Sequence, residues 1–97
     1  MTNRTLKQLR YVEALARHGH FGRAAAASAV SQPALSMQIR DLEAELGVAL
    51  FERGGREVRL TRFGETFVRR AGEVLRSVEE LGDLARASRD GLLGRLR

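Results

Sequence analysis

The chain has 97 residues, of which 43% are hydrophobic and 30% charged, which fits one small globular domain and excludes a barrel or an enzyme with its own cofactor cleft. It carries 17 basic and 12 acidic residues, a net charge of +5, and all but one of the basic residues are arginine. This balance favours a polyanionic partner such as nucleic acid. The absence of cysteine excludes disulfides, a Cys-based zinc site and a thiol nucleophile.

The first expected element is an amphipathic helix over residues 5–18. Its apolar residues recur at intervals of three and four: Leu6, Leu9, Val12 and Ala16. Thr5 and Gln8 have the spacing of a capping box, which predicts the start of the helix, and Gly19 predicts its end.

Two further helices are expected on either side of a short turn. After a turn at residues 20–22, an alanine-rich segment from Arg23 to Ser28 predicts a short helix. Ser31 is a good N-cap, and Pro33 suits the first turn of a third helix over about residues 32–46. Between the two helices, a left-handed conformation at Ala29 would cost roughly 1 kcal/mol or more.

The third expected helix has two distinct faces. Its buried face is predicted to hold Leu35, Ile39, Leu42 and Leu46. The opposite face holds Pro33, Ser36, Met37, Arg40 and Ala44. No acidic residue occurs from Ala14 through Arg40, so the N-terminal half of this helix can approach a polyanion, and the helix dipole adds positive charge there. Gln38 is expected at the edge of the core in a structural role.

Residues 50–60 predict a hairpin around Gly54-Gly55, with Arg53 and Arg56 flanking its tip. Because two strands alone are marginal in water, this hairpin must lean on the helices.

A final long helix is expected from Arg62 to about Asp90, with Thr61 as its N-cap. Its apolar residues follow an a/d pattern: Phe67, Ala71, Val74, Val78, Leu81 and Ala85. At ~1.5 Å per residue the helix spans roughly 43 Å, far more than the rest of the domain can cover. We therefore expect this seam to form a dimer interface, with intramolecular core as the alternative.

The predicted fold is mainly α: a winged helix-turn-helix of three helices and a two-stranded wing, followed by a long C-terminal dimerisation helix. Residues 1–61 are expected to form the winged helix-turn-helix domain, 62–90 the linker or dimerisation helix, and 91–97 the start of a truncated linker.

Several motifs identify a family. They are Ala24-Ala25, Ser31-Gln32-Pro33-Ala34-Leu35-Ser36-Met37-Gln38-Ile39, Leu42-Glu43, Leu46-Gly47, Leu50-Phe51-Glu52-Arg53 and Leu60-Thr61-Arg62-Phe63-Gly64. Together they resemble the N-terminal DNA-binding domain of LysR-type transcriptional regulators over about residues 5–90. The segment from Gly19 to Ala25 and the arginine-rich wing look most like the OxyR-like, peroxide-responsive branch.

The resemblance implies roles for individual residues. It implies that Gln32, Pro33, Ser36 and Met37 lie in the major groove, where Gln32 could pair with adenine and Pro33 could touch a thymine methyl. Met37 stands where the family often has Arg or another polar residue, and it offers no hydrogen-bond code. The candidate contacts to the DNA backbone are Arg23, Ser31, Ser36, Arg40, Thr61 and the wing residues Arg53 and Arg56.

The family further implies a homodimer, a tetramer in the full-length protein, and a C-terminal effector domain outside this sequence. We expect double-stranded DNA as the partner, no cofactor, no metal and no catalytic activity, because His18 and His20 lack companion ligands and no catalytic motif occurs. No signal peptide and no apolar run of ~18 residues is visible, which predicts a cytoplasmic protein. The resemblance further implies a bacterial protein associated with the nucleoid.

Two alternatives stay open. A helical protein–protein interaction module could use the long C-terminal helix as its surface, although such a module needs no basic wing. An RNA-binding domain would be expected to offer more aromatic stacking platforms than five aromatic residues provide.

Overall fold

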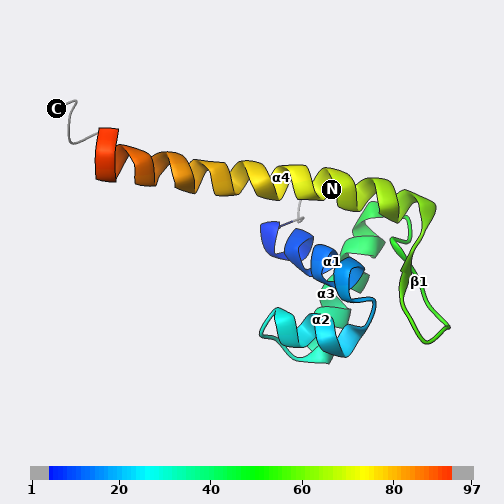
Figure 1. Ribbon diagram of the computed structural model, residues 1–97. Coiled ribbons are helices and arrows are strands. Elements are labelled where there is room, and N and C mark those ends of the chain that lie inside the picture. Colours follow the sequence, from blue (N-terminus) through cyan, green and yellow to red (C-terminus); the bar gives the residue numbers. More distant parts are fainter. Residues whose placement is uncertain (1–4, 93–97) are drawn as a thin grey trace.

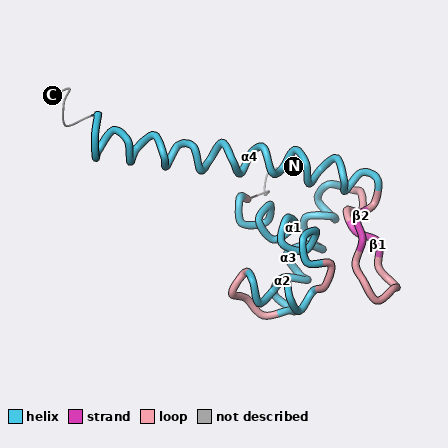
Figure 2. The backbone as a smooth tube through the Cα atoms, viewed as in Figure 1, coloured by secondary structure: helices cyan, strands magenta, loops and turns pink. Residues whose placement is uncertain are grey.

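A computed structural model describes the backbone of residues 5–92 and the side chains of residues 5–90. Four α-helices and a two-stranded antiparallel sheet follow one another along the chain (Figures 1 and 2). Their bounds are α1 Leu6–His18, α2 Phe21–Ala27, α3 Gln32–Leu46, β1 Phe51–Glu52, β2 Arg59–Leu60 and α4 Arg62–Ala87. This is the predicted winged helix-turn-helix with a long final helix. None of the described helices is long and apolar enough to cross a membrane.

Side-chain caps fix where the helices begin and end. The capping box at the start of α1 is complete: Thr5 Oγ1 accepts from the amide of Gln8, and the Gln8 side chain accepts from the amide of Thr5, both at 3.1 Å. Gly19 and Gly47 end α1 and α3 in the left-handed conformation, with φ of 65° and 76°. The predicted bounds of α1 and α3 are confirmed.

The start of α2 differs from the prediction. The helix begins at Phe21, two residues before Arg23, because the His20 side chain acts as its N-cap. His20 Nδ1 accepts from the amide of Arg23 at 3.2 Å. In the turn after α2, Ala29 adopts the left-handed conformation, with a φ of 59°, and so carries the cost stated above.

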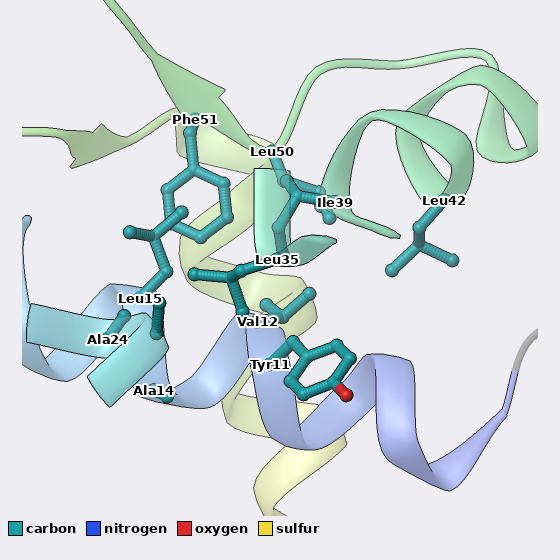
Figure 3. Packing of buried hydrophobic residues seen from close by; sticks show 11 residues of the cluster. Tyr11, Val12, Ala14, Leu15, Ala24, Leu35, Ile39, Leu42, Leu50 and Phe51 are labelled. Carbon is teal, nitrogen blue, oxygen red and sulfur yellow. The ribbon is translucent and has the colours of Figure 1, made fainter. Parts of the chain in front are cut away.

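The core lies between α1, α3 and the start of β1. Figure 3 shows side chains from these elements converging on one apolar cluster. The largest fully buried side chains are Val12, Leu15, Leu35, Ile39, Leu42 and Leu50. Ala24 and Ala25 of α2 are also buried, so their small side chains let α2 pack closely against its neighbours.

The wing is a short hairpin supported by the helices. Phe51 pairs with Leu60 and Glu52 with Arg59, so each strand has only two residues and the segment between them is irregular. The amide of Val58 donates to the carbonyl of Gly19 at 3.0 Å, which ties the returning arm of the wing to the end of α1. The wing therefore leans on the helical core, as a two-stranded sheet must.

Helix α4 begins in very close contact with the loop before the wing. Thr61 Oγ1 accepts from the amide of Gly64 at 2.9 Å and donates to the carbonyl of Ala49 at 2.8 Å. A methyl group at Gly64 would overlap the carbonyl oxygen of Leu50 and lie 3.0 Å from its carbonyl carbon. This position accepts only glycine, a requirement that the sequence analysis did not identify.

The far end of α4 also differs in detail from the prediction. Regular α-helix ends at Ala87, and Ser88–Leu92 continue as a turn of π-helix, so the helical path extends past the expected end near Asp90. In Figure 1, α4 extends far beyond the rest of the molecule. Residues 93–97, expected to be linker, lie outside the described part of the chain.

The contact at Gly64 generates the first prediction. Gly64→Ala should lower the free energy of unfolding by about 3 kcal/mol, because overpacking against fixed backbone cannot relax. Gly72→Ala is the matched control in the same helix: its new methyl would meet only the end of the Glu13 side chain, at 3.4 Å. That control should be neutral or stabilising by up to about 1 kcal/mol. Urea unfolding of both variants measures the difference, and equal stability of the two would contradict the close-contact account.

Candidate nucleic-acid interface

The outward face of α3 is small, polar and uncharged at its N-terminal end. Gln32, Pro33 and Met37 are exposed, Met37 to 61%, and Ser36 is partly buried. Arg40 is exposed one turn further along the helix. The first turn contains no acidic residue, so nothing on this surface repels a polyanion.

Gln38 points the other way and holds α3 in place. Its Oε1 accepts from Nε2 of Gln8 at 3.2 Å, and Gln8 is one of the buried residues of α1. The same Gln8 side chain completes the capping box at Thr5. The structural role expected for Gln38 is confirmed, because it links α3 to the start of α1.

The wing arginines have different environments. Arg56 is exposed near the tip. Arg53 is held by two groups: its Nη2 lies 3.1 Å from Oε1 of Glu43, and its guanidinium carbon lies 5.7 Å from the centre of the Phe21 ring. Its side chain remains 38% exposed, so a preorganised positive charge is presented at the base of the wing.

Glu43 is the residue that joins α3 to the wing, and the sequence analysis did not assign it this role. Its Oε2 accepts from the amides of Leu50 and Phe51, at 2.7 and 3.1 Å, while Oε1 holds Arg53. The side chain is only 10% exposed. Its partners lie seven to ten residues away, in and beside strand β1, so no helical spacing signals the contact.

A cleft of about 720 Å³ lies between the wing and the α1–α2 turn. Its basic and imidazole lining residues are His18, His20, Arg23, Arg53, Arg56 and Arg59. Glu52 and Glu57 also line it, so positive charge is in excess. An adjoining hollow of about 240 Å³ contains Gln32 together with Arg53 and Arg56. The structure thus brings the start of α3 and the wing together at one surface.

Two of the expected phosphate contacts serve as helix caps. Ser31 Oγ accepts from the amide of Ala34 at 3.2 Å, and its hydroxyl is exposed. The hydroxyl of Thr61 donates to the carbonyl of Ala49 and accepts from the amide of Gly64. Thr61 is thus the N-cap of α4, and its contact to phosphate stays a prediction.

The expected seam on α4 divides into two parts. Ala71 is buried within the single chain, and Phe67 packs against the core, so for these two residues the intramolecular alternative holds. The buried Leu75, which the a/d pattern missed, belongs to the same inward face. Other apolar residues of the helix remain exposed: Val74 is 45% exposed, Leu81 is 66% exposed and Ala85 is also exposed, while Val78 is partly buried. Leu84, which was not expected in the seam, is 67% exposed.

Metal-ligating residues do not cluster in the described part of the chain. No group of three or more His, Asp or Glu side chains there could hold a metal ion. The imidazole of His20 is instead used as a helix cap.

The order of α2, turn, α3 and hairpin, with a positively charged cleft between the wing and the α1–α2 turn, defines a winged helix-turn-helix DNA-binding domain. The family model for the bacterial regulatory helix-turn-helix protein, lysR family, matches residues 6–65. The chain belongs to the LysR family of regulators, and these residues are its helix-turn-helix domain.

Curated relatives of the chain are regulators. The hydrogen peroxide-inducible genes activator of Dickeya chrysanthemi is 47% identical over 91 residues, covering 94% of this chain and 30% of that protein. The probable RuBisCO transcriptional regulator of Porphyra purpurea is 49% identical over 76 residues, covering 78% and 24%. The chain therefore spans less than a third of either relative. The peroxide-inducible and the RuBisCO regulators match the chain at similar sequence identity, so sequence identity alone does not assign the chain to the peroxide-responsive branch.

Solved structures similar to this one include domains bound to DNA. The CbnR DBD–DNA complex superposes with a TM-score of 0.81 at 39% identity, over 88% of this chain and 98% of that chain. The BenM DBD with benA site 1 DNA gives 0.86 at 36% identity, over 91% and 99%. Full-length OxyR from Pseudomonas aeruginosa, in a variant form, gives 0.85 at 46% identity, over 91% and 30%.

The role of Glu43 generates the second prediction. Glu43→Ala removes the acceptor for two backbone amides at a largely buried position, so it should cost about 2–4 kcal/mol of unfolding free energy. Glu43→Gln keeps an oxygen for those amides and loses only the charged bond to Arg53, so it should cost about half as much. Asp41→Ala, at an exposed site on the same helix, is the control and should have little effect. Urea unfolding that ranks Glu43→Gln at or below Glu43→Ala in stability would contradict this assignment.

Proposed function

We propose that the chain binds double-stranded DNA in a sequence-specific manner, with α3 in the major groove and the wing on its flank. Gln32 and Pro33 would contact base edges, with Ser36 and Met37 beside them. The groups proposed to contact the backbone are Ser31, Arg40, Arg23, Arg53 and Arg56. The observation that carries the proposal is the common hollow of Gln32, Arg53 and Arg56, since it joins a base-reading end to a phosphate-binding edge.

The position of this surface supports the proposal. In Figure 1 the start of α3 and the wing loop lie on the side of the molecule away from α4. A duplex on that side would leave α4 free. The relatives bound to DNA in solved structures, the CbnR and BenM domains, share the fold at 36–39% identity, which supports the same mode of binding here.

The second part of the proposal is a homodimer formed through α4. The exposed apolar residues Val74, Leu81 and Leu84 of α4 leave a stripe that a second copy would cover. Residues 62–90 would then be the dimerisation element of a regulator whose domain comprises residues 1–61, with residues 91–97 leading to an effector domain. A tetramer in the full-length protein and a location on the bacterial nucleoid in the cytoplasm follow from the same proposal.

A helical protein–protein interaction module remains the second candidate, favoured by the same exposed stripe. It leaves the arginine-lined cleft of about 720 Å³ without a role. The DNA-binding proposal accounts for both features.

The third prediction separates base reading from phosphate contact. Gln32→Ala should weaken binding to a selected duplex by about 1–3 kcal/mol per half-site and relax the preference at one base position. Arg56→Ala should weaken selected and random duplexes alike and reduce the slope of log K against log salt by about one per half-site. With about four phosphates per protomer, the dimer should show a slope of about −7.

Fluorescence anisotropy over a range of salt concentrations measures both effects. A flat salt response of the unmodified chain would overturn the DNA-binding proposal itself. Equal losses for Gln32→Ala on selected and random duplexes would instead show that Gln32 does not read a base.

The fourth prediction tests the dimer. Leu81→Glu should leave each protomer folded, because Leu81 is 66% exposed in the single chain. In a dimer the same change would place unpaired charge in an apolar interface, so the protein should become monomeric at micromolar concentration. Arg76→Glu changes the charge on the far side of the helix and should remain dimeric.

Light scattering with circular dichroism measures mass and folding together. A wild-type monomer, or a dimer that survives Leu81→Glu, would refute the proposed role of this stripe.

A further inference from the structure

The exposed N-terminal end of α3 carries apolar side chains beside its uncharged polar ones. Pro33, Ala34 and Met37 are neighbours on the helix, at intervals of one, three and four residues, and all three are exposed. Gln32 and Ser36 are the hydrogen-bonding side chains beside them. A protein that discriminates bases through this surface must use contacts other than hydrogen bonds at part of its site.

Met37 is the most prominent of these residues. At 100° per residue it lies opposite the buried face formed by Leu35, Ile39 and Leu42, so it points directly away from the core. Its 61% exposure is the largest among the large apolar residues of the winged domain. The core does not cover it, so this apolar side chain is available to a partner.

The major groove contains one prominent apolar group, the C5-methyl of thymine. Adenine, guanine and cytosine present only hydrogen-bond donors and acceptors there. Methionine is long, unbranched and polarisable, so its side chain can fit against a methyl group without a fixed geometry. Pro33 and Met37 are one turn apart on the helix, and no charged residue lies between them in the sequence.

We propose that Met37 is a specificity-determining residue that reads a C5-methyl group in the major groove. It requires a thymine at one position of each half-site, and it accepts 5-methylcytosine at that position in place of thymine. This inference rests on the proposed function, since it assumes that α3 lies in the major groove. Methylation of cytosine at C5 would then strengthen binding at a site where unmodified cytosine is disfavoured.

The test begins with a duplex enriched by the chain from a randomised library. Each thymine of the enriched half-site is replaced in turn by 2′-deoxyuridine, which lacks only the methyl group. Replacement of one particular thymine should lower the affinity of wild type about four-fold per half-site, as expected for the loss of one buried methyl group. That thymine is a different one from any that Pro33 contacts. Met37→Gln, of similar length and polar, should show no loss at that position.

A second comparison places cytosine or 5-methylcytosine at the same position, opposite guanine. Wild type should prefer 5-methylcytosine by about four-fold, and Met37→Gln should bind the two equally. Pro33→Ala is the matched control on the same face and should keep the Met37-dependent preference. Because Met37 is exposed, Met37→Gln should unfold at the same urea concentration as wild type.

The outcomes separate the two levels of the proposal. Failure to enrich any duplex would overturn the proposed function. An enriched duplex in which no uracil substitution depends on Met37, or in which cytosine methylation has no effect, would overturn this inference and leave sequence-specific binding intact.

Discussion

The backbone at Leu50 is the point on which the arrangement of the molecule depends. Its amide donates to the Glu43 carboxylate of α3 at 2.7 Å, and its carbonyl accepts from the amide of Thr61 at 2.9 Å. Its side chain is fully buried, and Gly64 packs directly against its carbonyl. Four parts of the chain, α3, the wing, the core and α4, are therefore fixed relative to one another at a single residue.

This junction explains how a small domain presents a rigid interface. The wing has only two paired residues in each strand, too few to hold its own position. Glu43 on one side and the Gly19–Val58 hydrogen bond on the other determine where the wing lies relative to α3. Arg53 is held between Glu43 and Phe21, so a charged group at the proposed DNA surface also has a fixed position. Less conformational entropy is then lost when DNA binds.

The junction also determines what α4 can do. Its first turns pack on the core through Ala71 and Leu75, while its second half projects with Leu81 and Leu84 exposed. Because the start of α4 is fixed at Gly64, the direction of the projecting half is fixed as well. In the proposed dimer, that direction would set the separation of the two α3 helices and hence the spacing of the half-sites.

The sequence predicted those features whose cause lies within a few residues. Thr5, Ser31 and Thr61 were identified as caps, and Gly19 as an end, because capping bonds span three or four residues. The start of α2 was missed because histidine is an uncommon N-cap. Glu43 and Gly64 were missed because their partner, Leu50, lies seven residues from one and fourteen from the other, outside any helical spacing.

The long helix shows a different limit of sequence reasoning. A heptad pattern identifies apolar residues, and it does not distinguish those that cover the chain's own core from those left for a partner. Phe67 and Ala71 follow the pattern and pack inward, whereas Leu84 departs from it and is exposed.

The most direct test of the central claim is to map the DNA-bound surface residue by residue. Backbone amide signals of the chain, followed by nuclear magnetic resonance as duplex DNA is added, report which residues change environment. The account predicts that the shifts concentrate at residues 31–40 of α3 and at residues 53–57 of the wing, with residues 77–87 of α4 little changed. Shifts concentrated on the second half of α4, with α3 and the wing unaffected, would contradict it.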